Sequence, residues 1–413
     1  MYRTVSALIR PNDELLKMME DSRCIYDYAL YIQRQEYFNS RKAEKIKTFN
    51  YNELWNIVKN SKPYIESKLD VGPKTYAIKQ VCIAWSNFIK AIISYKKDSS
   101  KFTGKPKMPN YLYKRTKYNI VDIDSSRFRI RHCKDNEIRV PNGNYIFKFP
   151  KWLKRSDIKQ IKLQYFYGKI KVSFVYEDKK YIDNIVDKDS AIGIDLGVNN
   201  ICAITSNDKN FSCIIKGGPI KSINQYYNKK KANLQSSIAK CNKNQYTSKK
   251  LINLSNKRNN KINYYMHCIS KSIIDLCIAN KIEKIIIGHN NGWKQNICMS
   301  KKNTQNFIQI PFNILIEQIK YKAEKYLNLN VTVVEESYTS KCDHLAFESM
   351  QHHNEYLGKR IKRGIFVSST NKLLNADING AIGILRKGKA ITDAQILCLC
   401  NRGDGVSPSV LKI

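Results

Sequence analysis

The spacing of apolar residues changes twice along the chain, and these changes limit the folds open to it. Residues 12–38 and 53–96 repeat apolar and aromatic side chains at helical spacing. Residues 98–109, which combine Gly, Pro and Lys, break that spacing, and short alternating strands follow to about Asp187. The pattern predicts a short first strand, a helical block and then a small antiparallel β-barrel.

From Ser190 onward the pattern predicts strands that alternate with helices. Residues 190–217 read as a meander of three strands, and residues 221–281 read as two long basic helices. A strand at KIIIG, a helix at about 311–326, a strand at VTVVEE and a terminal helix from near Asp377 follow. The expected class is α/β, and 413 residues exceed what one core usually organises, so we expect two or three domains.

The charge of the chain indicates the partner. Lys and Arg number 72 against 35 Asp and Glu, a net charge of +37, which opposes compaction unless a polyanion neutralises it. Nucleic acid is therefore expected. No apolar run is long enough to span a membrane, the start has no signal-peptide core, and the scattered cysteines form no CxxC pair. These features predict a cytoplasmic protein with no membrane partner.

Acidic residues stand where three predicted elements begin or end. Asp195 lies where an apolar strand runs into Gly197, Glu335 and Glu336 close VTVVEE, and Asp377 opens a helix in NADINGA. Taken singly, Asp195 is compatible with a turn cap and Asp377 with a helix N-cap. Taken together at one sheet edge, such carboxylates would bind two Mg²⁺ ions that activate water and stabilise the leaving oxygen of a phosphodiester. In so basic a chain, this arrangement predicts a nuclease.

Five segments occur in one order: GIDLGVNN, GWKQ followed by NFIQIPF, EESYTSK, GKRIKRGIF and NADINGA. Together they resemble TnpB proteins, the transposon-encoded RNA-guided DNA nucleases related to compact type V CRISPR effectors. The resemblance covers about residues 190–390 and implies a RuvC domain of RNase H-like fold. By motif, Asp195 would be the first RuvC carboxylate and Asp377 the third.

The resemblance also implies a domain layout. Residues 1–10 and 102–188 would form a wedge-type β-barrel, and residues 11–101 a helical recognition lobe inserted into it. Residues 189–390 would form the RuvC-like nuclease domain, without a zinc ribbon, and residues 391–413 a C-terminal tail.

The second acidic position departs from the family pattern. Most relatives end the KIIIG strand with Glu, but here Gly288 and His289 follow, and Glu283 lies before the strand, as a surface charge would. Either catalysis is lost, as in nuclease-dead guided repressors, or the acid has moved to the neighbouring strand end. Because adjacent strand residues face opposite ways, only one of Glu335 and Glu336 should then reach the metals.

The zinc ribbon is a second departure. Relatives usually build it from two CxxC pairs, whereas here the corresponding span holds Cys342, His344, His352 and His353. Their spacing fits no standard zinc site, so a metal-free loop is the preferred interpretation.

We therefore expect a Mg²⁺-dependent, RNA-guided DNA endonuclease that cuts DNA complementary to a bound guide RNA beside a short flanking motif. Its partners would be the guide RNA, target double-stranded DNA and the displaced single strand. The basic helices would neutralise phosphates, and interleaved tyrosines would stack on bases. The alternatives are a nuclease-dead RNA-guided DNA-binding repressor, a compact type V CRISPR effector and, more distantly, a nonspecific RNA-binding protein.

Overall fold

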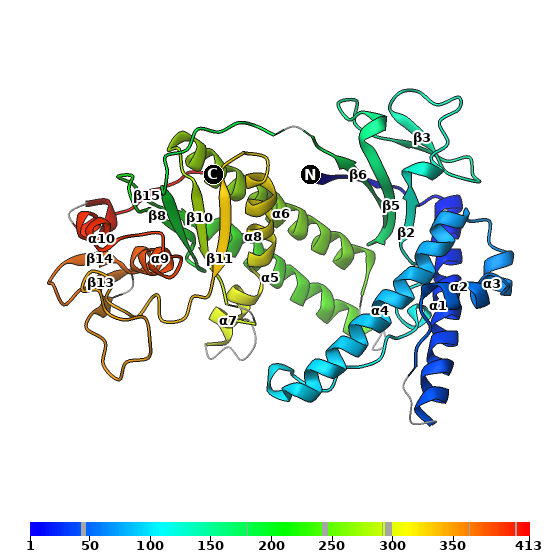
Figure 1. Cartoon of the computed structure of the whole chain (residues 1–413), viewed down its shortest axis with the longest axis horizontal. Helices are drawn as coiled ribbons and strands as arrows, with labels where there is room; N and C mark the ends of the chain where they lie inside the picture. Colours follow the sequence, from blue (N-terminus) through cyan, green and yellow to red (C-terminus); the bar gives the residue numbers. More distant parts are fainter. Residues whose placement is uncertain are drawn as a thin grey trace. The chain divides into compact units, whose positions relative to one another are not determined.

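The computed structural model describes residues 1–42, 47–179, 181–241, 247–290, 292–293, 300–362, 364–400 and 403–413. The chain divides into two compact units, Met1–Lys179 and Lys180–Ile413, each of which has its own elements and core (Figure 1). Among the helices of the described residues, none combines the length and the apolar character that a membrane crossing requires.

The helices of the first unit are α1 (Asp13–Lys42), α2 (Tyr51–Val58), α3 (Lys62–Ile65) and α4 (Val71–Lys97). Their starts carry the expected caps: Asn50 and Glu53 form a capping box on α2, and Asp70 accepts from the Gly72 amide at the start of α4. The helices pack through a core that includes Trp85, Leu15 and Ile78. The predicted break in helical spacing coincides with the end of α4.

The first unit also contains an antiparallel sheet of order β1-β6-β5-β2. Its strands are β1 (Tyr2–Ile9), β2 (Val121–Asp124), β5 (Ile158–Phe166) and β6 (Lys169–Glu177), and β3 (Glu137–Arg139) pairs separately with β4 (Ile146–Lys148). Short 3₁₀ turns lie at Ser99–Lys101, Leu112–Lys114, Ser125–Arg127 and Arg155–Asp157. Tyr167 and Gly168 both have positive φ, 49° and 78°, which suits the tight β5–β6 hairpin. The described pairings give an open strand order, and closure into a barrel stays a prediction.

The second unit is built on a six-stranded mixed sheet of order β11-β10-β7-β8-β9-β15. The predicted meander is β7 (Ala191–Leu196), β8 (Asn200–Ser206) and β9 (Ser212–Lys216), all antiparallel. β10 (Lys284–Gly288) is parallel to β7, and β11 (Asn330–Val334) is parallel to β10. At the far edge β15 (Ser409–Val410) pairs with β9, so the segment expected to be a tail adds a strand to this sheet.

Helices and a small sheet complete the second unit. The helices are α5 (Gly218–Cys241), α6 (Lys249–Ala279), α7 (Lys301–Ile308), α8 (Phe312–Ala323), α9 (Ala376–Lys387) and α10 (Asp393–Cys400), with a 3₁₀ turn at Gly403–Gly405. The small antiparallel sheet joins β12 (Lys359–Lys362), β13 (Ile365–Val367) and β14 (Leu373–Asn375).

Both faces of the large sheet are covered, which explains its nearly continuous apolar strands. On β7, Ile192, Ile194 and Leu196 belong to the core shared with α6 and α8. The alternate residues Gly193 and Asp195 face α9 instead, because successive side chains of a strand point to opposite faces. A Cβ on Gly193 would lie 2.4 Å from the carbonyl oxygen of Ala381, so this glycine lets α9 lie directly on β7.

We predict that Gly193→Ala lowers the free energy of unfolding by about 1–3 kcal/mol, because the added methyl group must displace the backbone of α9. Thermal denaturation of the purified protein measures the change. Gly218→Ala is the matched control, since a Cβ there meets nothing within 4 Å. A Gly193→Ala protein that melts with the wild type would show that α9 does not lie so close to β7.

Candidate active site

Asp195 lies near the end of β7, next to its last residue, and pairs with Ala203 of β8. Its side chain is half-buried and points toward α9, where a Cβ on Gly380 would lie 2.8 Å from its Oδ2 atom. The glycine of NADINGA therefore leaves room for the carboxylate. Asp195 thus lies between strand and helix, in a position that a simple turn cap would not occupy.

Asp377 lies in the first turn of α9, but it is not the N-cap. That role belongs to Asn375, whose side-chain oxygen accepts from the amides of Asp377 and Ile378 at 3.0 and 3.4 Å. The N-cap interpretation of Asp377 was wrong because the helix begins one residue earlier than the sequence pattern indicated. The carboxylate instead accepts a hydrogen bond from Asn200 Nδ2 at 2.7 Å and lies 3.8 Å from Arg360 Nη2.

Glu335 and Glu336 follow β11 and have different surroundings. Glu335 is exposed over 70% of its side chain, accepts from the Ser337 hydroxyl and lies 3.9 Å from Lys387 Nζ. Glu336 is half-buried, and its carboxyl lies close enough to that of Asp195 for the two groups to shift each other's pKa. The structure therefore brings Glu336 to Asp195 and leaves Glu335 outside.

The end of β10 makes room for Glu336. A Cβ on Gly288 would lie 3.4 Å from Glu336 Cγ and 2.5 Å from Ile384 Cδ1, so a larger residue would crowd both. Two residues on, the Asn290 side chain accepts from the Glu336 amide at 2.7 Å. The segment that departs from the family pattern thus positions the acid of the neighbouring strand.

The two carboxyls share an environment that disfavours two negative charges. Burial, then the charges of Glu336 and Asp377, raise the pKa of Asp195 well above its ordinary value. Burial raises the pKa of Glu336 to about 7. The Oε2 atom of Glu336 is also buried with no hydrogen-bond partner. Carboxyls held together in this way are typical of sites where a cation or a proton supplies the missing charge.

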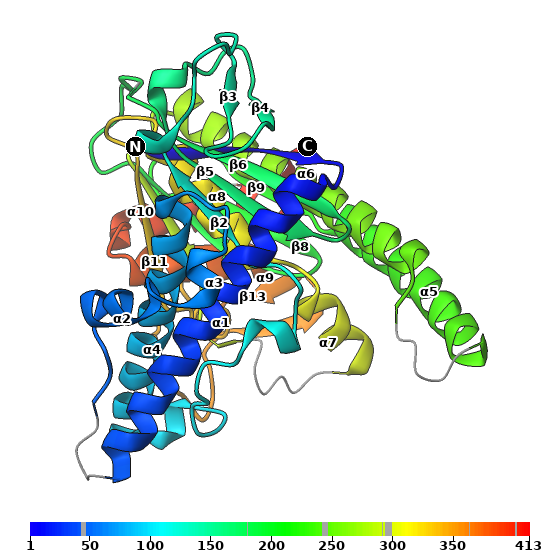
Figure 2. The ribbon, with the colours of Figure 1, turned by 90° about the vertical axis from the view of Figure 1, so that its right-hand side faces the viewer.

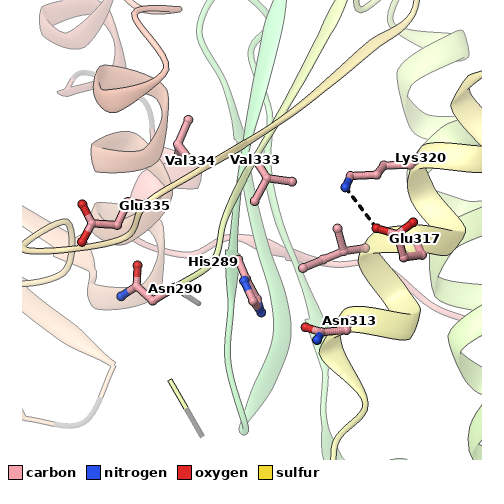
Figure 3. Close-up of a pocket in the computed structure, with 9 residues that line it drawn as sticks. His289, Asn290, Asn313, Glu317, Lys320, Val333, Val334 and Glu335 are labelled. Atoms are coloured by element: carbon pink, nitrogen blue, oxygen red, sulfur yellow. Dashed lines mark hydrogen bonds and ion pairs between the residues drawn. The ribbon is translucent and has the colours of Figure 1, made fainter. Parts of the chain in front are cut away.

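A pocket of about 720 Å³ is lined by residues that follow β10, by the end of β11 and by α8. Figure 3 shows its lining, with His289 and Asn290 following β10 and with Glu317 paired to Lys320 on α8 at 3.0 Å. Its lining includes Glu335, in keeping with the opposite directions of adjacent strand residues.

Other residues singled out in the sequence lie apart from the carboxyls. Glu283 accepts from the Asp189 amide at 2.7 Å and pairs with Lys284, at the end of β10 remote from Gly288. Trp293 of GWKQ packs against His289 and Phe312, whereas Lys294 and Gln295 lie outside the described residues.

Of the four residues weighed as zinc ligands, three take part in hydrogen bonds, and His352 packs against an aromatic ring. Arg386 donates to His344 Nδ1 at 2.9 Å, so Nε2 carries the proton and donates to the Thr339 carbonyl at 2.6 Å. Burial lowers the pKa of His344 to about 4. Cys342 and His353 both donate to the Ser349 carbonyl. His352 packs its ring edge-on against Tyr338.

Throughout the described ranges, no three His, Cys, Asp or Glu side chains already stand close enough to hold a metal ion, the three carboxylates included. Asp377 is instead engaged by Asn200 and Arg360. For all three carboxylates to hold a metal ion, Asp377 would have to turn from Arg360 toward Asp195 and Glu336.

Three residues of the site were missed in the sequence. Asn200 lies in GIDLGVNN, which carries the family resemblance, and Asn290 lies in IIIGHNN, which departs from it. An asparagine at a strand end does not indicate which residue it will contact. Arg360 belongs to GKRIKRGIF, which was considered only as a phosphate-neutralising segment. Their roles depend on contacts between distant parts of the chain.

Comparison with known proteins gives two family models over successive segments. Residues 173–294 match OrfB_IS605, described as a probable transposase, and residues 312–384 match the Cas12f1-like TNB domain. A comparison with curated proteins gives no match.

Solved structures give a likeness of fold. A cryo-EM structure of a Cas12f1-sgRNA-target DNA complex aligns with a TM-score of 0.57 at 15% identity, covering 90% of this chain and 82% of that one. A CRISPR-Cas12f ternary complex aligns with a TM-score of 0.33 at 15% identity, covering 90% and 80%, too low a score to support an argument. The first of these alignments shows that the chain shares the mixed α/β fold of that protein. The two family models follow one another in sequence order, so this chain is similar to the OrfB_IS605 probable transposases over residues 173–294 and to Cas12f1-like proteins over residues 312–384.

Proposed function

We propose that the protein is an RNA-guided DNA endonuclease that cuts DNA complementary to a bound guide RNA beside a short flanking motif. The observation that carries this proposal is the buried pairing of Asp195 with Glu336, with Asp377 beside it. The net charge of +37 and the guide RNA and target DNA named for the Cas12f1 complex support the partners. A cytoplasmic location stays a prediction.

We further propose that Asp195, Glu336 and Asp377 hold Mg²⁺. The ligand set consists of oxygens, which suit a hard cation, and the buried Glu336 Oε2 atom lacks a partner. Bound there, Mg²⁺ would activate water and stabilise the leaving oxygen of the phosphodiester. Asn200 would orient Asp377, Asn290 would fix the backbone of Glu336, and the Arg360 guanidinium would meet the DNA phosphate.

The second carboxylate is thus proposed to be Glu336 rather than Glu335. Glu336 lies beside Gly288 and close to Asp195, whereas the side chain of Glu335 is 70% exposed. On this proposal, the departure at IIIGHNN is a relocation of the acid and not a loss of catalysis.

The guided function is tested by sequencing the RNA that copurifies with the expressed protein and then supplying that RNA with a matched DNA target and Mg²⁺. Cleavage that follows the guide sequence is expected. Guided binding without cleavage would establish the repressor alternative, and binding that ignores the guide would establish a nonspecific RNA-binding protein.

We predict that Asp195→Ala and Asp377→Ala each reduce DNA cleavage by orders of magnitude and leave guided DNA binding nearly unchanged, because metal ligands contribute to chemistry more than to docking. Cleavage rates and binding affinities with a matched guide measure both effects. Asp275→Ala is the control, since this residue is exposed and pairs with Lys271 on the surface of α6. Wild-type cleavage by either variant would remove that residue from the proposed site.

We predict that Glu336→Gln lowers the cleavage rate by orders of magnitude. Glu335→Gln should change the activation free energy of cleavage by about 0.5 kcal/mol or less, since surface substitutions usually have small effects. The two substitutions are chemically identical and adjacent, so each controls for the other in one Mg²⁺ cleavage assay. If Glu335→Gln is the inactive variant, the assignment is reversed. If both cut normally, the acid has not moved to this strand end.

We predict that Mg²⁺ raises the melting temperature more at about pH 8 than at about pH 5.5, because metal ligands must lose their protons. The raised pKa of Glu336 means that the metal-free protein loses stability as the pH rises from 4.5 to about 7, and bound Mg²⁺ restores it. Thermal denaturation with Mg²⁺ or chelator measures the shift. Glu336→Gln should remove most of the shift, and an equal shift in that variant would contradict the proposed site.

A further inference from the structure

The helical hairpin of α5 and α6 has a one-sided charge. Residues 218–274 contain twelve Lys and Arg and no Asp or Glu. A segment of this kind cannot neutralise itself, so its charge calls for a polyanion from outside the hairpin.

A groove of about 740 Å³ runs between the two helices, which lie side by side in Figures 1 and 2. Its walls combine aromatic and cationic side chains from both helices: Tyr226, Tyr227, Lys230, Lys250, Lys257 and Lys261. Apolar side chains, Ile223, Leu234 and Leu254, also line it. Phosphates would pair with the cationic side chains. The apolar side chains would pack against a flat, unpaired group such as a nucleotide base.

Hydrogen bonds between side chains fix the two helices that form the groove. Arg258 donates from Nε to Asn224 Oδ1 at 2.8 Å and from Nη2 to the Gln309 carbonyl at 2.9 Å. The Tyr227 and Ser255 hydroxyls lie 3.2 Å apart across the two helices. A groove that is already formed loses less entropy when a ligand binds.

Tyr226 is the side chain best placed to hold a base. It is 63% exposed and lines the groove, so its ring is accessible to a base. Lys230 lies 6.0 Å from its ring centroid and would bring a phosphate-binding charge beside the stacking surface.

The start of α5, which precedes the groove, is connected to Asp377 through Asn199 and Asn200. The Gly217 amide, just before α5, donates to the Asn199 carbonyl at 2.7 Å, and Lys221 donates to the Asn199 side chain. The next residue, Asn200, holds Asp377. From Ser222 to Leu234 the groove follows α5 for about 18 Å, which is long enough for a few nucleotides.

We propose that the α5–α6 groove binds an unpaired segment of the DNA strand that reaches the carboxylate site, with a base stacked on Tyr226. A duplex hides its base faces and would leave the apolar lining unused. The start of α5 contacts Asn199, the neighbour of the residue that holds Asp377, so we assign the groove to the strand that is cut and not to the guide RNA. This inference rests on the proposed function for the identity of the strand.

The test measures binding of a short fluorescent DNA single strand, not complementary to the guide, to guide-loaded protein in the presence of a chelator. Tyr226→Ala should weaken binding about tenfold, the size expected for loss of one stacked base. Tyr264→Ala is the matched control, because this tyrosine of α6 is 72% exposed and lies outside the groove lining. Lys257→Ala should reduce the salt slope of binding by about one.

A strand with abasic positions separates stacking from a general loss of affinity. The difference between wild type and Tyr226→Ala should disappear on that strand. Equal affinity of the two proteins for the normal strand overturns the proposal. So does a Tyr226 effect that is larger for RNA or for an RNA–DNA hybrid of the same sequence.

The binding assay needs no cleavage, so the two proposals fail separately. Tyr226-dependent binding by a protein that never cuts a matched target would refute the nuclease and keep the groove. Normal guided cleavage with unchanged binding by Tyr226→Ala would refute the groove alone. Unchanged melting of Tyr226→Ala, expected for an exposed residue, verifies that the variant is folded.

Discussion

The close contact of α9 with β7 is the constraint on which the arrangement of the second unit depends. Two glycines permit it from opposite sides: Gly193 on the strand faces Ala381, and Gly380 on the helix faces Asp195. Without side chains at these points, the start of α9 comes close enough to the end of β7 for Asp377 to act on the charge of Asp195. The carboxyl cluster is therefore a product of backbone packing, and its acids are placed by residues that have no functional group.

The position of Glu336, the proposed second acid, also depends on a glycine, in this case on β10. Gly288 at the end of β10 lets Ile384 of α9 approach the strand, and Glu336 contacts the same place from the neighbouring strand while Asn290 holds its backbone. Parallel strands end at one edge of a sheet, so an acid can come from either of two strands and meet the same partners. The pairing of Glu336 with Asp195 is electrostatically unfavourable unless a proton or a cation is present. Such a pair persists because the surrounding backbone fixes it.

Hydrophobic spacing was enough to predict the meander, the KIIIG strand and the α/β class of the second unit, because buried strands and long helices have strong periods. It also placed Asp195 at a strand end, and the family resemblance with the alternation of strand residues limited the proposed second acid to Glu335 or Glu336. The choice of Glu336 needed the position of α9, which no local pattern contains. The cap of α9 was misassigned because Asn375 and Asp377 are both good capping residues. The strand at residues 409–410 was missed because two residues carry no period.

The segment from Thr339 to Leu357 has a consequence for the conditions under which the protein matures. His344 bridges Thr339 and Arg386, and Glu348 accepts from the Asp343 and Leu357 amides, so neutral imidazole and backbone groups tie this segment to α9. A cysteine-ligated ribbon at the same place would require the cell to deliver a metal and to keep four thiols reduced. Hydrogen bonds form as soon as the chain folds. The described contacts that hold this segment beside α9 therefore come from the chain's own side chains and backbone.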